Sequence, residues 1–110
     1  MDLSSKKCVP CEAGTPPMPF DKAQEYLQQT PGWILVRDEE MKIKRDFTFK
    51  DFKESMVFVN KVADLAESEG HHPDIYIFYN KVNLILYTHA AKGLSENDFV
   101  MAAKINKIAI

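Results

Sequence analysis

The sequence lacks the features that mark membrane-spanning, exported and nucleotide-binding proteins. Its apolar runs fall well short of the roughly 20 residues that cross a bilayer, and its start, MDLSSKKC, lacks the apolar core of a secretory signal. The chain holds only 4 glycines, and none belongs to a phosphate-binding loop or a Gly-x-Ser-x-Gly turn. We therefore expect a cytoplasmic protein that uses neither nucleotide-driven chemistry nor serine hydrolysis.

Neither sign of charge dominates, and cysteine is scarce. The 14 basic and 16 acidic residues give a formal net charge of -2, so we expect no binding surface for nucleic acid or an acidic membrane. The 2 cysteines, Cys8 and Cys11, form one CVPC segment without a second pair or the strand-helix setting of a thioredoxin motif. We expect reduced thiols of local importance rather than a disulfide framework.

What the sequence does contain is the composition of one folded domain. At 110 residues, with 45% hydrophobic and 27% charged residues, the chain is long enough for a single core and too short for two. Residues 1–19 hold four of the six prolines and both cysteines, so they are predicted to form an N-terminal tail or strap. Residues 20–110 are predicted to form the domain.

Helical spacing of apolar residues predicts three helices. The first covers residues 20–29 and is ended by a Thr-Pro-Gly sequence. The second covers residues 49–69 and stops at Gly70, which tolerates the left-handed conformation. The third begins where Ser95 and Asp98 have the spacing of a capping box. The predicted buried face of the second helix consists of Phe52, Met56, Val59, Ala63 and Ala66.

Alternating residues predict two hairpins. Residues 33–38 and 41–49 are joined through Glu39-Glu40, and residues 75–79 and 82–88 through Asn80-Lys81. Hairpins mixed with helices, without strand-helix-strand alternation, favour an α+β fold in the order α-β-β-α-β-β-α. In that fold, three helices pack on one face of a four-stranded antiparallel sheet. Because such a sheet leaves exposed edges, we expect a second copy to cover one of them in a homo-oligomer.

The three histidines are the strongest functional signal. His71 and His72 follow a helix end, and Pro73 favours an extended conformation for His72, so the two side chains should diverge from a fixed loop. A hairpin that turns at Asn80-Lys81 pairs residues whose numbers sum to about 161, which places His89 opposite His72. Since histidine, with an ordinary pKa of about 6.5, gives and takes protons near neutral pH, this convergence predicts an acid/base site.

Two other interpretations stay open. The histidines could be unrelated surface or core residues, or they could bind zinc or iron together with a carboxylate. Adjacent histidines rarely share one ion, however, and the helical HExxH spacing is absent. On its position alone, Asp98 fits a helix-capping role better than a catalytic one, and Glu67 could simply be an exposed carboxylate in the last turn of its helix.

The acidic and histidine residues follow one another at a recognisable spacing: Glu67, His71-His72-Pro73, His89 and Asp98. Together with the segments YNKV and THAAKGLSENDF, it resembles the signature of the pterin-4a-carbinolamine dehydratase family, also called dimerization cofactor of hepatocyte nuclear factor, from about Trp33 to the C-terminus. The resemblance implies a hydro-lyase that converts 4a-hydroxytetrahydropterin to quinonoid dihydropterin in tetrahydrobiopterin recycling. It implies no metal and no organic cofactor.

The resemblance also implies roles for residues and partners. His71 and His89 are expected to be the catalytic acid/base pair. The expected substrate-binding residues are His72, Asp98, Glu67 and Thr88, with Asp98 or Glu67 orienting an imidazole. Expected partners are the pterin substrate, a functionally linked aromatic amino acid hydroxylase and further copies of the chain in a homodimer or homotetramer, with no direct nucleic acid and no membrane. The family's second name supports an alternative, an oligomeric partner protein that acts as a transcriptional coactivator or dimerization cofactor.

Overall fold

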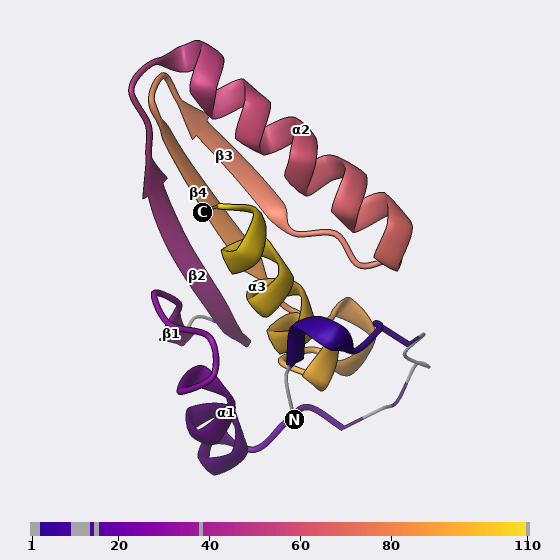
Figure 1. The fold of residues 1–110 in the computed structure, drawn as a ribbon. Helices are drawn as coiled ribbons and strands as arrows, with labels where there is room; N and C mark the ends of the chain where they lie inside the picture. The colour runs from indigo at the N-terminus through magenta and orange to yellow at the C-terminus, as the bar shows by residue number, and fades with distance from the viewer. Residues whose placement is uncertain (1–2, 10–13, 15, 38, 110) are drawn as a thin grey trace.

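The computed structural model describes residues 3–9, 14, 16–37 and 39–109, which form an antiparallel sheet covered by helices (Figure 1). The main elements are α1 (Phe20–Leu27), β1 (Ile34–Arg37), β2 (Met41–Thr48), α2 (Phe52–Glu69), β3 (Asp74–Phe78), β4 (Lys81–Leu86) and α3 (Glu96–Ile108). Two short 3-10 helices, η1 (Leu3–Ser5) and η2 (His89–Ala91), complete them. The predicted α+β class and the order α-β-β-α-β-β-α are confirmed.

The sheet has the strand order β1-β2-β4-β3, and all its pairs are antiparallel. Figure 1 shows α2 and α3 over the same face of the sheet, and α1 near β1. The sheet residues buried on that face are Ile43, Phe47, Val82, Leu84 and Leu86. The ring of Tyr26 in α1 stacks on Phe99 of α3 at 5.2 Å, which joins the first and last helices. The core therefore ties the two ends of the domain together.

Helix α2 begins later than predicted, and its buried face agrees with the prediction only in part. Its cap is Asp51, whose side chain accepts the Glu54 N–H at 2.9 Å, so residues 49–51 lie outside the helix. Phe52 is 49% exposed and stacks on Tyr79 at the hairpin end, 6.5 Å between ring centroids. The buried residues of the helix are Ser55, Phe58, Val59, Val62 and Ala66. The predicted stripe was wrong for Phe52 because the first helical turn extends beyond the sheet core.

The β3–β4 hairpin turns one residue earlier than predicted. Phe78 pairs with Lys81, so the turn is Tyr79-Asn80, with Tyr79 at φ 52°. The Asn80 carbonyl accepts the Phe49 N–H at 2.7 Å, and this contact with the β2–α2 connection holds the turn in place. Paired residue numbers consequently sum to 159, as in Asp74 with Ile85, and the predicted sum of 161 was wrong.

No helix among the described residues is long and apolar enough to span a membrane.

Candidate active site

His71 is held at the junction of α2 and α3. Gly70 ends α2 with φ 68°, a left-handed conformation that turns the chain out of the helix and toward β3. The His71 side chain is only 12% exposed, and its Nε2 lies 2.6 Å from Oδ1 of Asp98, whose side chain is fully buried. A charge-assisted hydrogen bond in such a place fixes both the position and the orientation of the imidazole.

Asp98 combines two functions in one carboxylate. Its Oδ2 accepts the backbone N–H of Ser95 at 2.9 Å, and the predicted capping box at the start of α3 is confirmed. The same oxygen accepts the hydroxyl of Thr88 at 2.9 Å. Oδ1 remains for His71. The helix cap and the histidine contact are therefore compatible, because they use different oxygens of the carboxylate.

Thr88 lies beneath this arrangement rather than open to solvent. It is 4% exposed, and its hydroxyl also lies 2.7 Å from the hydroxyl of Ser95. Its backbone N–H donates to the Gly93 carbonyl at 2.7 Å, which closes the loop that carries η2. Thr88 thus holds the Asp98 carboxylate in place, and it also lines a groove on this side of the molecule.

The second imidazole, His72, points to a different carboxylate. Its Nε2 lies 2.6 Å from Oε2 of Glu67, five residues earlier in the last turn of α2. The side chains are 58% and 78% exposed, respectively, so solvent screens their interaction strongly. As expected for an extended His-His-Pro segment, the two neighbouring imidazoles diverge.

His89 belongs to η2, beyond the end of β4. Its ring packs against Tyr87, with 4.3 Å between centroids and a 46° tilt, and the ammonium group of Lys42 lies 4.6 Å from the Tyr87 centroid. The imidazole itself is exposed. With the observed register, His72 aligns with Tyr87 and not with His89, so the predicted direct pairing of the two histidines was wrong.

All three histidines nevertheless border one groove. This hollow has a volume of about 270 Å³ and is lined by Gly70, His71, His72, Tyr87, Thr88, His89 and Ala90. Within the described part of the chain, no three side chains of His, Cys, Asp or Glu gather closely enough to hold a metal ion. The groove instead offers a half-enclosed imidazole and an exposed one to the same bound molecule, an arrangement suited to proton transfer at two points.

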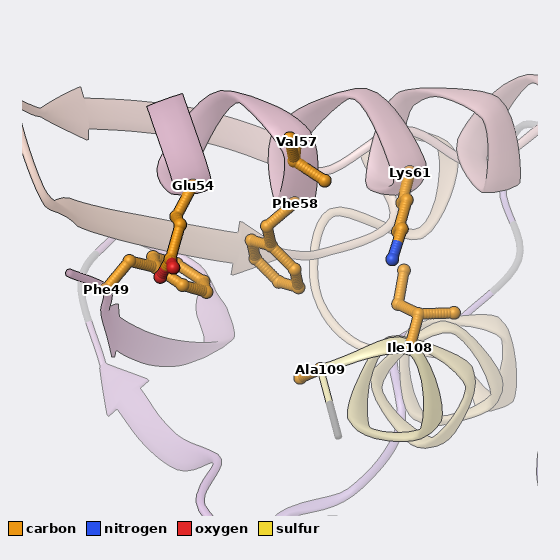
Figure 2. A pocket seen from close by; sticks show the side chains of 7 residues that line it. All are labelled: Phe49, Glu54, Val57, Phe58, Lys61, Ile108 and Ala109. Atoms are coloured by element: carbon orange, nitrogen blue, oxygen red, sulfur yellow. The ribbon is translucent and has the colours of Figure 1, made fainter. Parts of the chain in front are cut away.

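A second hollow on the molecule has no histidine in its lining. It lies between α2 and the end of α3, with a volume of about 250 Å³ (Figure 2). Its lining consists of Phe49, Glu54, Val57, Phe58, Lys61, Ile108 and Ala109. Because no histidine reaches it, it does not have the acid/base chemistry of the histidine groove.

Sequence reasoning missed the contribution of the N-terminal segment. The Cys8 N–H donates to Oε1 of Glu69 at 2.8 Å, and Lys104 donates to Oε2 of the same carboxylate at 2.7 Å. The hydrogen bond from Lys104, followed by the one from the Cys8 backbone, lowers the pKa of Glu69. Burial, and then the Glu69 charge, raise the pKa of the Cys8 thiol to about 12. Cys8 is a free thiol, whereas Cys11 lies outside the described residues.

Tyr87 and Asn97 also border the site without having been predicted. Tyr87 precedes His89 by two residues, the spacing that places strand side chains on one side, so the sequence did contain a signal for it. Asn97 had no such signal. Its importance depends on contacts with residues near the other end of the chain.

Comparison with known proteins places these residues in a family context. The family model described as pterin 4 alpha carbinolamine dehydratase matches residues 16–108. A putative pterin-4-alpha-carbinolamine dehydratase of Alkaliphilus metalliredigens is 45% identical over 107 residues, covering 96% of this chain and 95% of that protein. Pterin-4-alpha-carbinolamine dehydratase 2, mitochondrial, of Arabidopsis thaliana is 46% identical over 112 residues, covering 99% of this chain and 60% of that protein.

A solved structure agrees with the same relationship. The transcriptional coactivator/pterin dehydratase from Brucella melitensis superposes with a TM-score of 0.80 at 37% sequence identity. The match covers 86% of this chain and 99% of that chain. The similarity in fold therefore extends over nearly the whole of the related protein.

Proposed function

Since the chain belongs to the pterin-4-alpha-carbinolamine dehydratase family and is an enzyme of the hydro-lyase class, we propose that it dehydrates 4a-hydroxytetrahydropterin to quinonoid dihydropterin by histidine acid/base catalysis. The observation that carries the proposal is the groove lined by His71, His72 and His89, with His71 bound to the buried Asp98. A cyclic carbinolamine needs two proton transfers to lose water, and this groove supplies two imidazoles for them.

The elimination is balanced by one acid and one base. The base removes the proton from ring nitrogen N5, and the electrons of that N–H bond form the N5–C4a double bond. The C4a–O bond breaks at the same time, and the acid protonates the departing hydroxyl, which leaves as water. His71 and His89 carry out these two transfers from different sides of the groove. Because Nε2 of His71 is held by Asp98, Nδ1 is the ring nitrogen left for the pterin.

The remaining groove residues bind and position the substrate. His72, oriented by Glu67 at 2.6 Å, holds the pterin at the exposed rim. Thr88 and Asp98 act from below, since the Thr88 hydroxyl donates to the carboxylate that orients His71. Neither a metal nor an organic cofactor takes part in this scheme. The pterin product would feed the tetrahydrobiopterin cycle of an aromatic amino acid hydroxylase, and we propose the cytoplasm as the compartment, although the plant relative is named mitochondrial.

Histidine substitutions test the catalytic proposal. We expect His71→Ala and His89→Ala each to lower kcat by roughly 10²-fold, the usual contribution of a positioned acid or base. The assay follows the loss of 4a-hydroxytetrahydropterin above its spontaneous rate, and circular dichroism checks that the fold is retained. His72→Ala is the matched control, because a residue that only holds the substrate should raise KM more than it lowers kcat. Near-normal kcat in either of the first two variants would contradict the assignment.

A second candidate function is that of a partner protein in transcription. The Brucella relative is named a transcriptional coactivator as well as a pterin dehydratase, and this chain exposes apolar side chains on its helices and edge strand. Phe52 is 49% exposed and Val57 53% exposed on α2, while Tyr76 and Phe78 are about half exposed on β3. Capture of a specific partner by a variant lacking all three histidines would support this function separately from catalysis.

We also propose that the enzyme is a homodimer or homotetramer. Strand β3 is an edge of the sheet, and its burial is low along its whole length. Tyr76 and Phe78 pair with Asn83 and Lys81 of β4 on the face away from the core. An edge with exposed aromatic residues is typical of a surface that pairs with another strand, and a second copy would supply an equivalent one.

A further inference from the structure

The N-terminal segment borders the histidine groove at two places. At one end, Cys8 and Val9 line a hollow of about 270 Å³ together with Glu69, Gly70, His71, Thr88 and Asn97. This hollow shares Gly70, His71 and Thr88 with the histidine groove. At the other end, Gly14, Pro16 and Pro17 line a hollow with residues 89–92, which shares His89 and Ala90 with the groove. The described residues of the segment therefore extend the groove on the side of each catalytic histidine.

The first contact is a pair of hydrogen bonds between Asn97 and Val9. The Val9 N–H donates to Oδ1 of Asn97 at 3.0 Å, and Nδ2 of Asn97 donates to the Val9 carbonyl at 2.6 Å. The side-chain amide thus binds both polar backbone groups of Val9, accepting from its N–H and donating to its carbonyl. Asn97 is only 6% exposed, so these bonds form in a largely water-free place.

Further contacts hold the N-terminal segment in place before and after Val9. The Cys8 N–H donates to Glu69, and its thiol lies 3.6 Å from the Asn97 carbonyl. Leu3 is 3% exposed and belongs to the hydrophobic core. The Met18 N–H donates to the Leu94 carbonyl at 2.7 Å. The segment is therefore a fixed strap, defined here as residues 3–9, 14 and 16–18.

The first turn of α3 connects the strap to catalysis. Asn97 and Asp98 are consecutive residues, one holding Val9 of the strap and the other holding His71 of the groove. Glu69 completes the link from α2, since it binds Cys8 and Lys104 just two residues before His71. A movement of the strap would open the hollow beside His71 without breaking any bond of His71 itself.

We propose that the strap is a wall of the substrate groove, and that Asn97 is the positioning residue that keeps Cys8 and Val9 against the bound pterin. The identity of the ligand rests on the proposed function. In this arrangement the pterin ring lies between His71 and His89, and the part of the ligand that extends past His71 contacts the strap. The strap contributes to binding of pterins and not to the proton transfers.

The test compares Asn97→Ala with a control variant that weakens the strap elsewhere. Lys6→Ala removes an exposed ion pair with Glu96, 3.1 Å long, that does not border the groove. We expect Asn97→Ala to raise KM about tenfold with kcat within about twofold. Asn97→Asp cannot donate to the Val9 carbonyl and places a carboxylate oxygen against it, so this variant should raise KM at least as much. Lys6→Ala should leave KM unchanged.

A second readout does not depend on turnover. In a Cys11→Ser background, Cys8 is the remaining thiol, and its rate of alkylation by N-ethylmaleimide reports on the strap. We expect saturating 7,8-dihydropterin, a pterin with no 4a-hydroxyl to lose, to slow the alkylation of Cys8 at least threefold, and to protect it much less in Asn97→Ala.

The outcomes separate this proposal from the proposed catalysis. An unchanged KM in Asn97→Ala, or alkylation of Cys8 that is indifferent to bound 7,8-dihydropterin, would overturn the strap as a groove wall even if the protein is a fully active dehydratase. Protection of Cys8 that is lost in Asn97→Ala would support the wall even if the histidine variants kept their activity. Binding of 7,8-dihydropterin itself is measured by calorimetry in each variant.

Discussion

Asp98 caps helix α3 and, in the proposed function, also supports catalysis through His71. We expect Asp98→Asn to lower kcat by at least about tenfold and the free energy of unfolding by about 2 kcal/mol. An amide has one acceptor oxygen, so it cannot accept from Ser95 and Thr88 while it also accepts from His71, as the carboxylate does. Steady-state kinetics and urea unfolding measure the two effects.

Glu67→Gln is the matched control for this carboxylate. Glu67 also contacts an imidazole at 2.6 Å, but its side chain is 78% exposed. We expect its removal to leave unfolding unchanged and to affect KM only, because an exposed ion pair stabilises little. If Asp98→Asn behaved like Glu67→Gln in both measurements, the buried carboxylate would have no special role.

The lowered pKa of Glu69 should make the free energy of unfolding depend on pH. Its pKa is lower in the folded protein than its ordinary value because of the hydrogen bond from Lys104, so the folded state favours the ionised form. This stabilisation is fully present above the ordinary pKa of about 4.3 and is lost as the pH falls through the lower, folded-state pKa. Glu69→Gln should therefore be less stable than the parent by about 1–2 kcal/mol at pH 7.

The difference in the free energy of unfolding between the parent protein and Glu69→Gln should decrease as the pH falls. Urea unfolding of the parent and of Glu69→Gln from pH 7 down to pH 3 gives the comparison. A difference that stayed constant with pH would show that the carboxylate's charge has no part in joining Cys8, α2 and α3.

For individual side chains, contacts between residues close in the sequence could be predicted better than contacts between residues far apart in it. Glu67 and His72 are only five residues apart, and Ser95 with Asp98 has a known local spacing, so both contacts could be predicted. The pairing of Asn97 with Val9 joins residues 88 positions apart. No local pattern specifies such a contact, because it forms only when α3 and the strap pack together.

Among the elements, the α2–β3 connection depends most on one residue. Gly70 has φ 68°, and a Cβ added there would meet no atom within 4 Å. The cost of Gly70→Ala is therefore conformational and not steric, and we expect a loss of about 1 kcal/mol in the free energy of unfolding. Because asparagine tolerates the left-handed region, Gly70→Asn should be less destabilising. Thermal unfolding of the two variants compares them, and an equal loss in both would contradict a conformational cause.

The helices, the strands and their order could be predicted from the periodicity of apolar residues. The register of the β3–β4 hairpin and the exposure of Phe52 could not. The order α-β-β-α-β-β-α required only the apolar pattern and the Pro and Gly positions. The hairpin register depended on the placement of the turn by a single residue. The observed turn is held by a contact with the distant Phe49, which no local pattern predicts. The exposed position of Phe52 likewise results from where the sheet ends and not from the helical spacing of the residue.

On the scale of the whole molecule, the edge strand β3 predicts assembly. If the proposed homo-oligomer forms through this edge, we expect Phe78→Lys, at a position that is 57% exposed, to reduce it to smaller species, since a charge on an edge strand opposes pairing. Size-exclusion chromatography with light scattering measures the mass. Glu25→Lys, an exposed charge change on α1, is the control. An unchanged mass for Phe78→Lys would place the interface elsewhere.

The first turn of α3 also determines when during synthesis the groove can form. His71 and the strap leave the ribosome well before Asn97 and Asp98, the residues that hold them in place. A growing chain therefore has His71 and His72 without these supports until residues 97 and 98 are made. Since long-range contacts form late and slowly in folding, we expect the groove to be complete only after α3 has docked. A chain cut before α3 should keep the histidines but lack the proposed activity.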